Sequence, residues 1–183
     1  VVVIGGGLTA IDTATEAIAY YPVQVEKFLH RYELLVAEQG EAVVRAGWDE
    51  EERVIAEEFL AHARALQAER VQAANEKRTP RITELLQSWG GSTVVYRKRL
   101  IDSPSYTLNH EEVEKALEEG IWFAEELTPE RIEVDRWGHA ESIVFASTTI
   151  DESGQWNASQ ETSLPARATR AITKPQRPIT RRI

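Results

Sequence analysis

Cysteine is absent from the 183 residues of the chain. Without it, this segment cannot form disulfides, thiolate zinc sites or iron–sulfur clusters of its own. Long apolar runs are also lacking, since no stretch approaches the roughly 20 apolar residues that a membrane span needs. The N-terminus has no basic lead of the kind that signal peptides carry. We therefore expect a cytoplasmic protein without a membrane partner.

Metal and nucleophile motifs are lacking as well. The sequence contains no nucleophile elbow and no adjacent serine and base of the kind that acyl-transfer enzymes use. No His, Asp and Glu set has the spacing of a metal site, so we expect no bound metal and ordinary surface or core histidines at His30, His62, His110 and His139.

Acidic side chains are missing from the end of the chain. Residues 165–183 hold six of the 21 basic residues and no acidic residue, so residues 1–164 carry a net charge of −15. A body this acidic repels polyanions, and we expect no nucleic-acid partner. We predict that the basic segment 171–183 is a solvated, disordered tail rather than a binding arm.

The first half of the chain combines one short strand with a long helical region. VVVI at residues 1–4 is typical of a buried parallel strand. A helix is predicted from Leu8 to about Tyr20, closed by Tyr21-Pro22 because the residue before proline avoids the α region. The pattern then stays helical over 22–91. Further helices are predicted to end near Gly40, to begin at Asp49 with a capping box to Glu52, and to run over 81–89 before Gly90-Gly91.

The second half alternates strands with one helix. We predict a strand over 93–96, a loop over 101–108, a helix over 111–119 with Asn109 as N-cap, and a strand over 121–125. Alternation over 131–147 around Asp-Arg-Trp-Gly indicates a β-hairpin, and two short strands are expected near 155–156 and 162–168.

One run of six residues matches the dinucleotide-binding fingerprint G-x-G-x-x-A: Gly5, Gly6, Gly7, Leu8, Thr9 and Ala10. In this fingerprint the first glycine makes a tight turn, the second admits a pyrophosphate to the backbone amides, and the alanine keeps helix and strand close. The run follows a predicted strand and opens a predicted helix, which is the required context. The alternative is a glycine-rich turn that serves packing alone.

The residue that usually binds the ribose is not at its usual distance. In the fingerprint this residue lies about 20 positions after the glycines, at the tip of the next strand. In this sequence the acidic residue at that distance is Glu26, which falls in the helical region. With that region set aside, the next strand is 93–96, and its tip carries the basic run Arg97, Lys98 and Arg99. Basic side chains there favour the 2′-phosphate of NADPH, by about one to two decades per charge-assisted bond. The alternative is that all three are solvated surface residues.

The stretches GGGLTAIDTATEA and VVYRKRLIDSPSYTLNHEEVEKALEEGIWF, in this order, carry a family resemblance. They resemble the NADPH-binding domain of the glutamate synthase small subunit and its relatives among the FAD-dependent pyridine nucleotide-disulfide oxidoreductases. The likeness covers residues 1–20 and about 92–148. It implies that Gly5, Gly7, Leu8 and Thr9 contact the pyrophosphate and that Arg97 and Arg99 contact the 2′-phosphate. Leu8 stands where the family commonly has aspartate.

The fold class expected from these observations is α/β. We predict a Rossmann-like, three-layer NAD(P)-binding domain with a β-meander and a large all-helical insertion after the first βα unit. The predicted domains are 1–21 with 92–170 for NAD(P)H binding, 22–91 for the helical insertion, and 171–183 for the basic tail.

The expected function is that of an NADPH-binding fragment of a larger NADPH:flavin oxidoreductase. It would hold the nicotinamide for hydride transfer to FAD, which belongs to another domain of the same polypeptide outside this segment. An iron–sulfur or other electron-transfer partner is a further candidate. We expect no catalytic residue in the fragment, and the start of the chain at the motif suggests an excised domain.

Two alternatives accompany this interpretation. In the first, the chain is a non-catalytic protein-interaction module, in which the helical insertion docks a partner on a Rossmann scaffold. Glu111 and Glu112 either approach the nicotinamide or occupy a helix start for dipole reasons, and the second explanation also accounts for Asp12.

Overall fold

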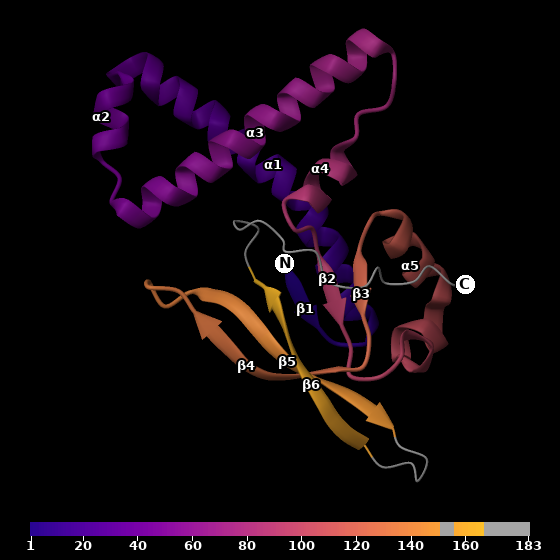
Figure 1. Cartoon of the computed structure of the whole chain (residues 1–183). Helices are drawn as coiled ribbons and strands as arrows, with labels where there is room; N and C mark the ends of the chain where they lie inside the picture. Colours follow the sequence, from indigo (N-terminus) through magenta and orange to yellow (C-terminus); the bar gives the residue numbers. More distant parts are fainter. Residues whose placement is uncertain (151–155, 167–183) are drawn as a thin grey trace. The chain divides into compact units, whose positions relative to one another are not determined.

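Figure 1 shows the computed structural model of the chain, which describes residues 1–150 and 156–166. The chain divides into two compact units. The first, the sheet unit, holds Val1–Ala17 and the described chain from Leu86 onward, and the second, the helical unit, is Ile18–Leu85. The domain boundaries at 21/22 and 91/92 stay predictions. The predicted tail 171–183 lies outside the described residues.

A short parallel sheet forms the part of the sheet unit that positions the candidate site. Its strands are β1 (Val2–Ile4), β2 (Thr93–Val95) and β3 (Trp122–Ala124), in the order β1-β2-β3. Val3 is paired with Val94, which is paired in turn with Phe123. Because all three strands run the same way, their carboxyl ends meet at one edge of the sheet.

An antiparallel sheet forms the second part of this unit. It contains β4 (Leu127–Val134), β5 (Ala140–Ile150) and β6 (Trp156–Pro165), with β5 in the centre. The predicted hairpin is confirmed: its turn places Gly138 at φ 84°, and the Asp135 carboxylate accepts from the amides of Trp137 and His139. Two short strands are expected near 155–156 and 162–168; the residues of both that the structure assigns to a strand belong to one strand, β6, while 155, 167 and 168 lie outside the described residues. The two sheets share an apolar cluster of Val95, Ile143 and Phe145, with Val2, Ala124, Leu127 and Leu164 packed against it.

Helix α5 (Pro104–Glu118) begins earlier than the sequence analysis predicts. A 3₁₀ turn, η1 (Leu100–Asp102), leads into it, and the Ser103 side chain accepts from the amide of Tyr106 as N-cap. Proline occupies the first helical turn, where its missing N–H costs nothing. Two helical segments meet at Asn109, whose backbone is non-helical at φ −156° and ψ 78°. The second segment therefore begins directly after Asn109, where the sequence analysis predicts an N-cap.

Helix α1 (Leu8–Gln39) passes through Pro22 without ending, so the predicted stop at Tyr21-Pro22 is wrong. Proline there removes the hydrogen bond to the carbonyl of Ile18. Pro22 is buried, and aromatic packing holds the helix on both sides of it: the ring of Phe59 meets those of Tyr21 and Phe28 edge-on. The aromatic packing around Phe59 therefore outweighs the local tendency of proline to end a helix.

Three further helices complete the helical region: α2 (Glu41–Ala46), α3 (Glu50–Glu76) and α4 (Ile82–Ser88). The predicted capping box of α3 is confirmed. The Asp49 carboxylate accepts from the amide of Glu52 at 2.8 Å, and the Glu52 carboxylate accepts from the amide of Asp49 at 3.0 Å. The predicted end of α4 is confirmed too, since Gly90 and Gly91 have positive φ and the amide of Gly91 donates to Leu86. Helix α2 is not predicted from the sequence.

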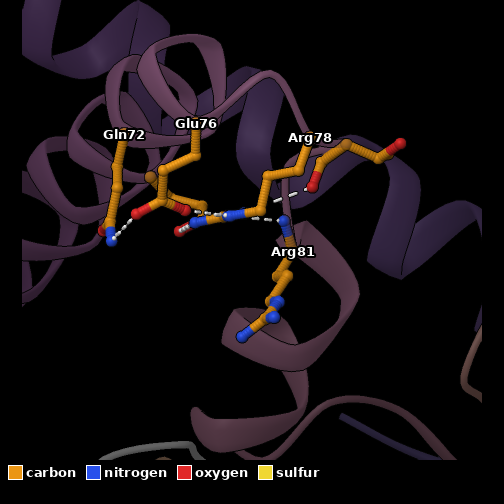
Figure 2. A network of polar contacts seen from close by, with 6 residues as sticks. Gln72, Glu76, Arg78 and Arg81 are labelled. Atoms are coloured by element: carbon orange, nitrogen blue, oxygen red, sulfur yellow. Dashed lines mark hydrogen bonds and ion pairs between the residues drawn. The ribbon is translucent and has the colours of Figure 1, made fainter.

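A polar network closes the turn between α3 and α4 (Figure 2). The Arg78 guanidinium donates to both carboxylate oxygens of Glu69 and to Glu76, and Glu76 also accepts from Gln72. The backbone amide of Arg81 donates to Glu69 at 2.7 Å. These bonds lower the pKa of Glu69 to about 2, first through Arg78 and then through Arg81. The carboxylate therefore stabilises this turn only while it is ionised.

The predicted fold class, an α/β Rossmann-like three-layer domain with a helical insertion, is wrong. The parallel sheet described here has three strands of three residues, and the strands after it form a separate antiparallel sheet. A doubly wound fold needs more parallel strands with crossover helices on both faces. The helical region is also no insertion after a finished βα unit, because α1 continues unbroken from the glycines to Gln39.

Candidate nucleotide-binding turn

Gly5 turns the chain out of β1 in a conformation that favours glycine. Its φ is +154°, and its amide donates to the Val95 carbonyl at 3.0 Å, which ties the turn to the end of β2. A Cβ at Gly5 would lie 3.3 Å from the Cβ of Ala10, which is buried in the first turn of α1. The two small residues thus allow the close approach of strand and helix that the fingerprint requires.

Gly7 is the open position of the turn. A Cβ built there would meet nothing within 4 Å, and the Gly7 carbonyl accepts from the amide of Ala10, which starts helix α1. The amides of Leu8 and Thr9 in the first turn donate to no acceptor in the described part of the chain. No acidic residue lies in this turn. Free amides at the positive end of a 32-residue helix make a site that suits an anion.

Gly6 is covered by a residue that the sequence analysis missed, Tyr96. A Cβ on Gly6 would overlap the Tyr96 ring, so the ring lies directly against the glycine backbone. The Gly6 carbonyl accepts from the amide of Ser105 at 2.9 Å, and the buried hydroxyls of Ser103 and Ser105 lie 3.0 Å apart. The start of α5 is therefore fixed against the glycine turn. Ser103-Pro104, a common N-cap and first-turn pair, is the sequence signal that could have predicted this.

The predicted basic residues follow β2, on the same sheet edge as the glycines. Arg97, Lys98 and Arg99, called the basic tip below, are all exposed. Arg97 and Lys98 form no ion pair with any residue that the structure describes. Arg99 differs from them, because its Nε and Nη2 donate to the two carboxylate oxygens of Asp102 at 2.8 and 3.1 Å. The hydrogen bond with Asp102 raises the pKa of Arg99 and lowers that of Asp102.

Carboxylates surround the basic tip, which the sequence analysis did not anticipate. Besides Asp102, Glu125 and Glu126 follow β3 and interact electrostatically with Arg99. Glu125 accepts from the amide of Leu100 at 2.6 Å, and the amide of Glu126 donates to the Lys98 carbonyl at 3.2 Å. Arg99 thus interacts with all three carboxylates, and Asp102 also interacts with Lys98. A 2′-phosphate would meet a nearly neutral tip in which only part of the positive charge is available.

The other candidate residues have structural partners or exposed positions. Glu112 forms a surface ion pair with Lys115 at 3.7 Å, while Glu111 and Asp12 are exposed. His62 lies in the helical unit, where its Nδ1 is 2.6 Å from the Tyr21 hydroxyl and burial lowers its pKa. Residues 1–150 and 156–166 contain no cluster of three His, Asp or Glu side chains that could hold a metal. Within the same ranges, every helix is either too short or too polar to cross a membrane.

No protein-family model matches the chain. The chain is similar to the uncharacterized protein RP006 of Rickettsia prowazekii (strain Madrid E), with 42% identity over 149 residues, or 81% of this chain. It spans only 19% of the length of that relative.

Proposed function

We propose that this chain is the NADPH-binding part of a flavin-dependent oxidoreductase similar to the glutamate synthase small subunit. The observation that carries the proposal is the glycine turn, in which Gly7 is open and the first amides of α1 have no acceptor among the described residues. Turns of this kind at a helix start bind the pyrophosphate of dinucleotides. The chain spans only 19% of the length of its relative. We therefore propose that an FAD domain and any electron-transfer partner lie outside the 183 residues.

The residues fit NADPH at the pyrophosphate end and partly at the 2′-phosphate end. Gly5 and Ala10 shape the turn, and the amides of Gly7, Leu8 and Thr9 would hold the pyrophosphate. Arg97 is free to meet the 2′-phosphate, with Lys98 beside it. When bound, the nicotinamide would supply a hydride to a flavin held elsewhere. This chain's own task is then to bind and orient the dinucleotide, and we expect no turnover from the chain alone.

Titration of NADPH and NADH against the 183-residue chain by calorimetry tests the proposal. We expect saturable 1:1 binding of NADPH and weaker binding of NADH. Absence of binding for both nucleotides at millimolar concentration would contradict it. With this function we also propose a cytoplasmic location. Localisation of the tagged chain in cells tests it.

The alternative of an interaction module is favoured by a different observation. The helical unit exposes large apolar side chains on α1, α2 and α3: Tyr20, Val23, Leu34, Leu35, Val43, Val54 and Val71. Exposed apolar side chains that lie together form interaction surfaces, and these residues are the candidates for such a surface. The same titration separates the two functions, since an interaction module has no need to bind a dinucleotide.

A further inference from the structure

We infer that Asp102 lowers the preference of this chain for NADPH by competing with the 2′-phosphate for Arg99. The inference rests on the proposed function, and it assigns to Asp102 a positioning role through Arg99. Its consequence is that Arg97, rather than both arginines, carries the recognition of the 2′-phosphate in the unmodified chain.

The geometry of the pair is the one that a phosphate would require. Arg99 donates from Nε and Nη2 to the two oxygens of Asp102, so one edge of its guanidinium plane is satisfied by a carboxylate. Guanidinium groups bind carboxylate and phosphate in the same two-pronged way. The carboxylate of Asp102 and a bound phosphate would therefore compete for the same donors of Arg99.

The turn that holds Asp102 is fixed by several backbone hydrogen bonds. The amide of Asp102 donates to the Arg99 carbonyl at 3.0 Å, and the amide of Ser103 donates to Leu100 at 2.9 Å. Glu125 accepts from the amide of Leu100, and the next residue after Asp102 is the fully buried Ser103. Asp102 is thus held three residues after Arg99 by the fold.

The strength of the pair sets the size of the effect. The side chains of Arg99 and Asp102 are 62% and 42% exposed, so solvent screens their attraction. Exposed pairs of this kind typically change an equilibrium by a factor of about 1.5 to 5. A phosphate can therefore displace Asp102, but this displacement lowers the affinity for NADPH. The affinity for NADH is not lowered, because NADH lacks the 2′-phosphate. Repulsion between the carboxylate and the phosphate adds to that cost.

The test measures the dissociation constants of NADPH and NADH for the 183-residue chain and its D102N variant. Asparagine keeps the size of the side chain and removes its charge. We expect NADPH to bind about three- to tenfold more tightly to D102N, and NADH to change by less than about twofold. The D102E variant, which keeps the carboxylate, should retain the ratio of the unmodified chain.

Two controls separate this role from general effects of charge. E161Q removes one carboxylate from the exposed pair of Arg131 and Glu161 on the antiparallel sheet, whose contacts are 3.2 and 3.3 Å, and it should leave the NADPH ratio unchanged. Relative to R99A, the R99A/D102N double variant should gain less than half of the NADPH affinity that D102N gains relative to the unmodified chain. Thermal melting of each variant checks that it is folded.

The possible results are distinct. A gain that depends on Arg99 supports the inference. An unchanged ratio in D102N, or an equal gain with and without Arg99, overturns it while the proposed function stands. If the unmodified chain binds neither nucleotide, both the proposed function and this inference are wrong.

Discussion

At the scale of single residues, the three glycines of the turn differ in what limits them. Gly5 is limited by its backbone conformation and by Ala10, and Gly6 by the Tyr96 ring. Gly7 has no such limit inside the protein, because space around it is open. Packing therefore does not require glycine at position 7, and the proposed dinucleotide site would account for its small size.

Substitution of Gly7 by alanine separates folding from binding. The added methyl meets no protein atom, and the change at a helix start should alter the free energy of unfolding by less than about 1 kcal/mol. We expect NADPH affinity to fall at least tenfold, because the methyl group occupies the approach to the amides. Denaturant unfolding and calorimetry measure the two quantities. Gly7→Ala binding NADPH as well as the unmodified chain would show that the turn serves packing alone.

Arg97 is the basic residue that should decide between the two nucleotides. A charge-assisted bond to phosphate contributes about 1.5–3 kcal/mol, so Arg97→Ala should weaken NADPH binding by about one to two decades. NADH, which lacks the 2′-phosphate, should bind nearly as before. The Arg136→Ala variant removes an exposed arginine from the hairpin turn and serves as the matched control. An equal loss for both nucleotides would mean that Arg97 acts on a part that they share.

At the scale of elements, ends of helices depend on charge as well as on local propensity. The turn between α3 and α4 is held by Glu69, whose side chain is only 13% exposed and accepts from Arg78 and Arg81. Because folding lowers the pKa of Glu69 from 4.5 to about 2, its contribution to stability is present above about pH 4.5. That contribution is lost as the pH falls toward 2.

The Glu69→Gln variant tests this pH dependence. At pH 7 it should melt at a lower temperature than the unmodified chain, because glutamine removes the charge that Arg78 and the Arg81 amide bind and leaves Arg78 with Glu76 alone. The difference between the two melting temperatures should shrink as the pH is lowered from 4.5 to 2. Circular dichroism at a series of pH values gives both curves. A difference that stays constant over this range would contradict the assigned role of the carboxylate.

At the scale of the whole molecule, the proposed ligand contacts all belong to the sheet unit. Neither the glycine turn nor the basic tip lies within Ile18–Leu85. Each unit also has its own buried apolar residues, among them Phe145 in the sheet unit and Leu66 in the helical unit. Nucleotide binding should therefore depend on one core and not on the other.

Core substitutions in the two units test this separation. Leu66→Ala should lower the stability of the helical unit by about 2–5 kcal/mol and leave the NADPH dissociation constant within about twofold of its original value. Phe145→Ala should cost about 3–5 kcal/mol and weaken NADPH binding, because Phe145 packs with Val95 at the end of β2. Loss of NADPH binding in Leu66→Ala would show that the helical unit takes part in the site.

Signals that act over a few residues could be predicted from the sequence. The capping box of α3, the Gly90-Gly91 end of α4, the hairpin turn at Gly138 and the position of the glycine turn all depend on neighbours within about five positions. Their physical causes, a side-chain cap or a positive φ, are properties of single residues. The Arg97–Arg99 run was likewise visible as the tip of a strand.

Only the tertiary structure decided the features that depend on distant residues. Helix α1 crosses Pro22 because Phe59 on α3 packs beside it, which outweighs the lost hydrogen bond. The strands after β3 make a separate antiparallel sheet because their apolar residues cover the parallel one through Val95, Ile143 and Phe145. Tyr96 and Ser105 reach Gly6, and carboxylates from two loops gather around the basic tip, because parallel strands bring their carboxyl ends to one edge. The sequence by itself determined where an anion could bind, and the fold determined how much positive charge is free to bind it.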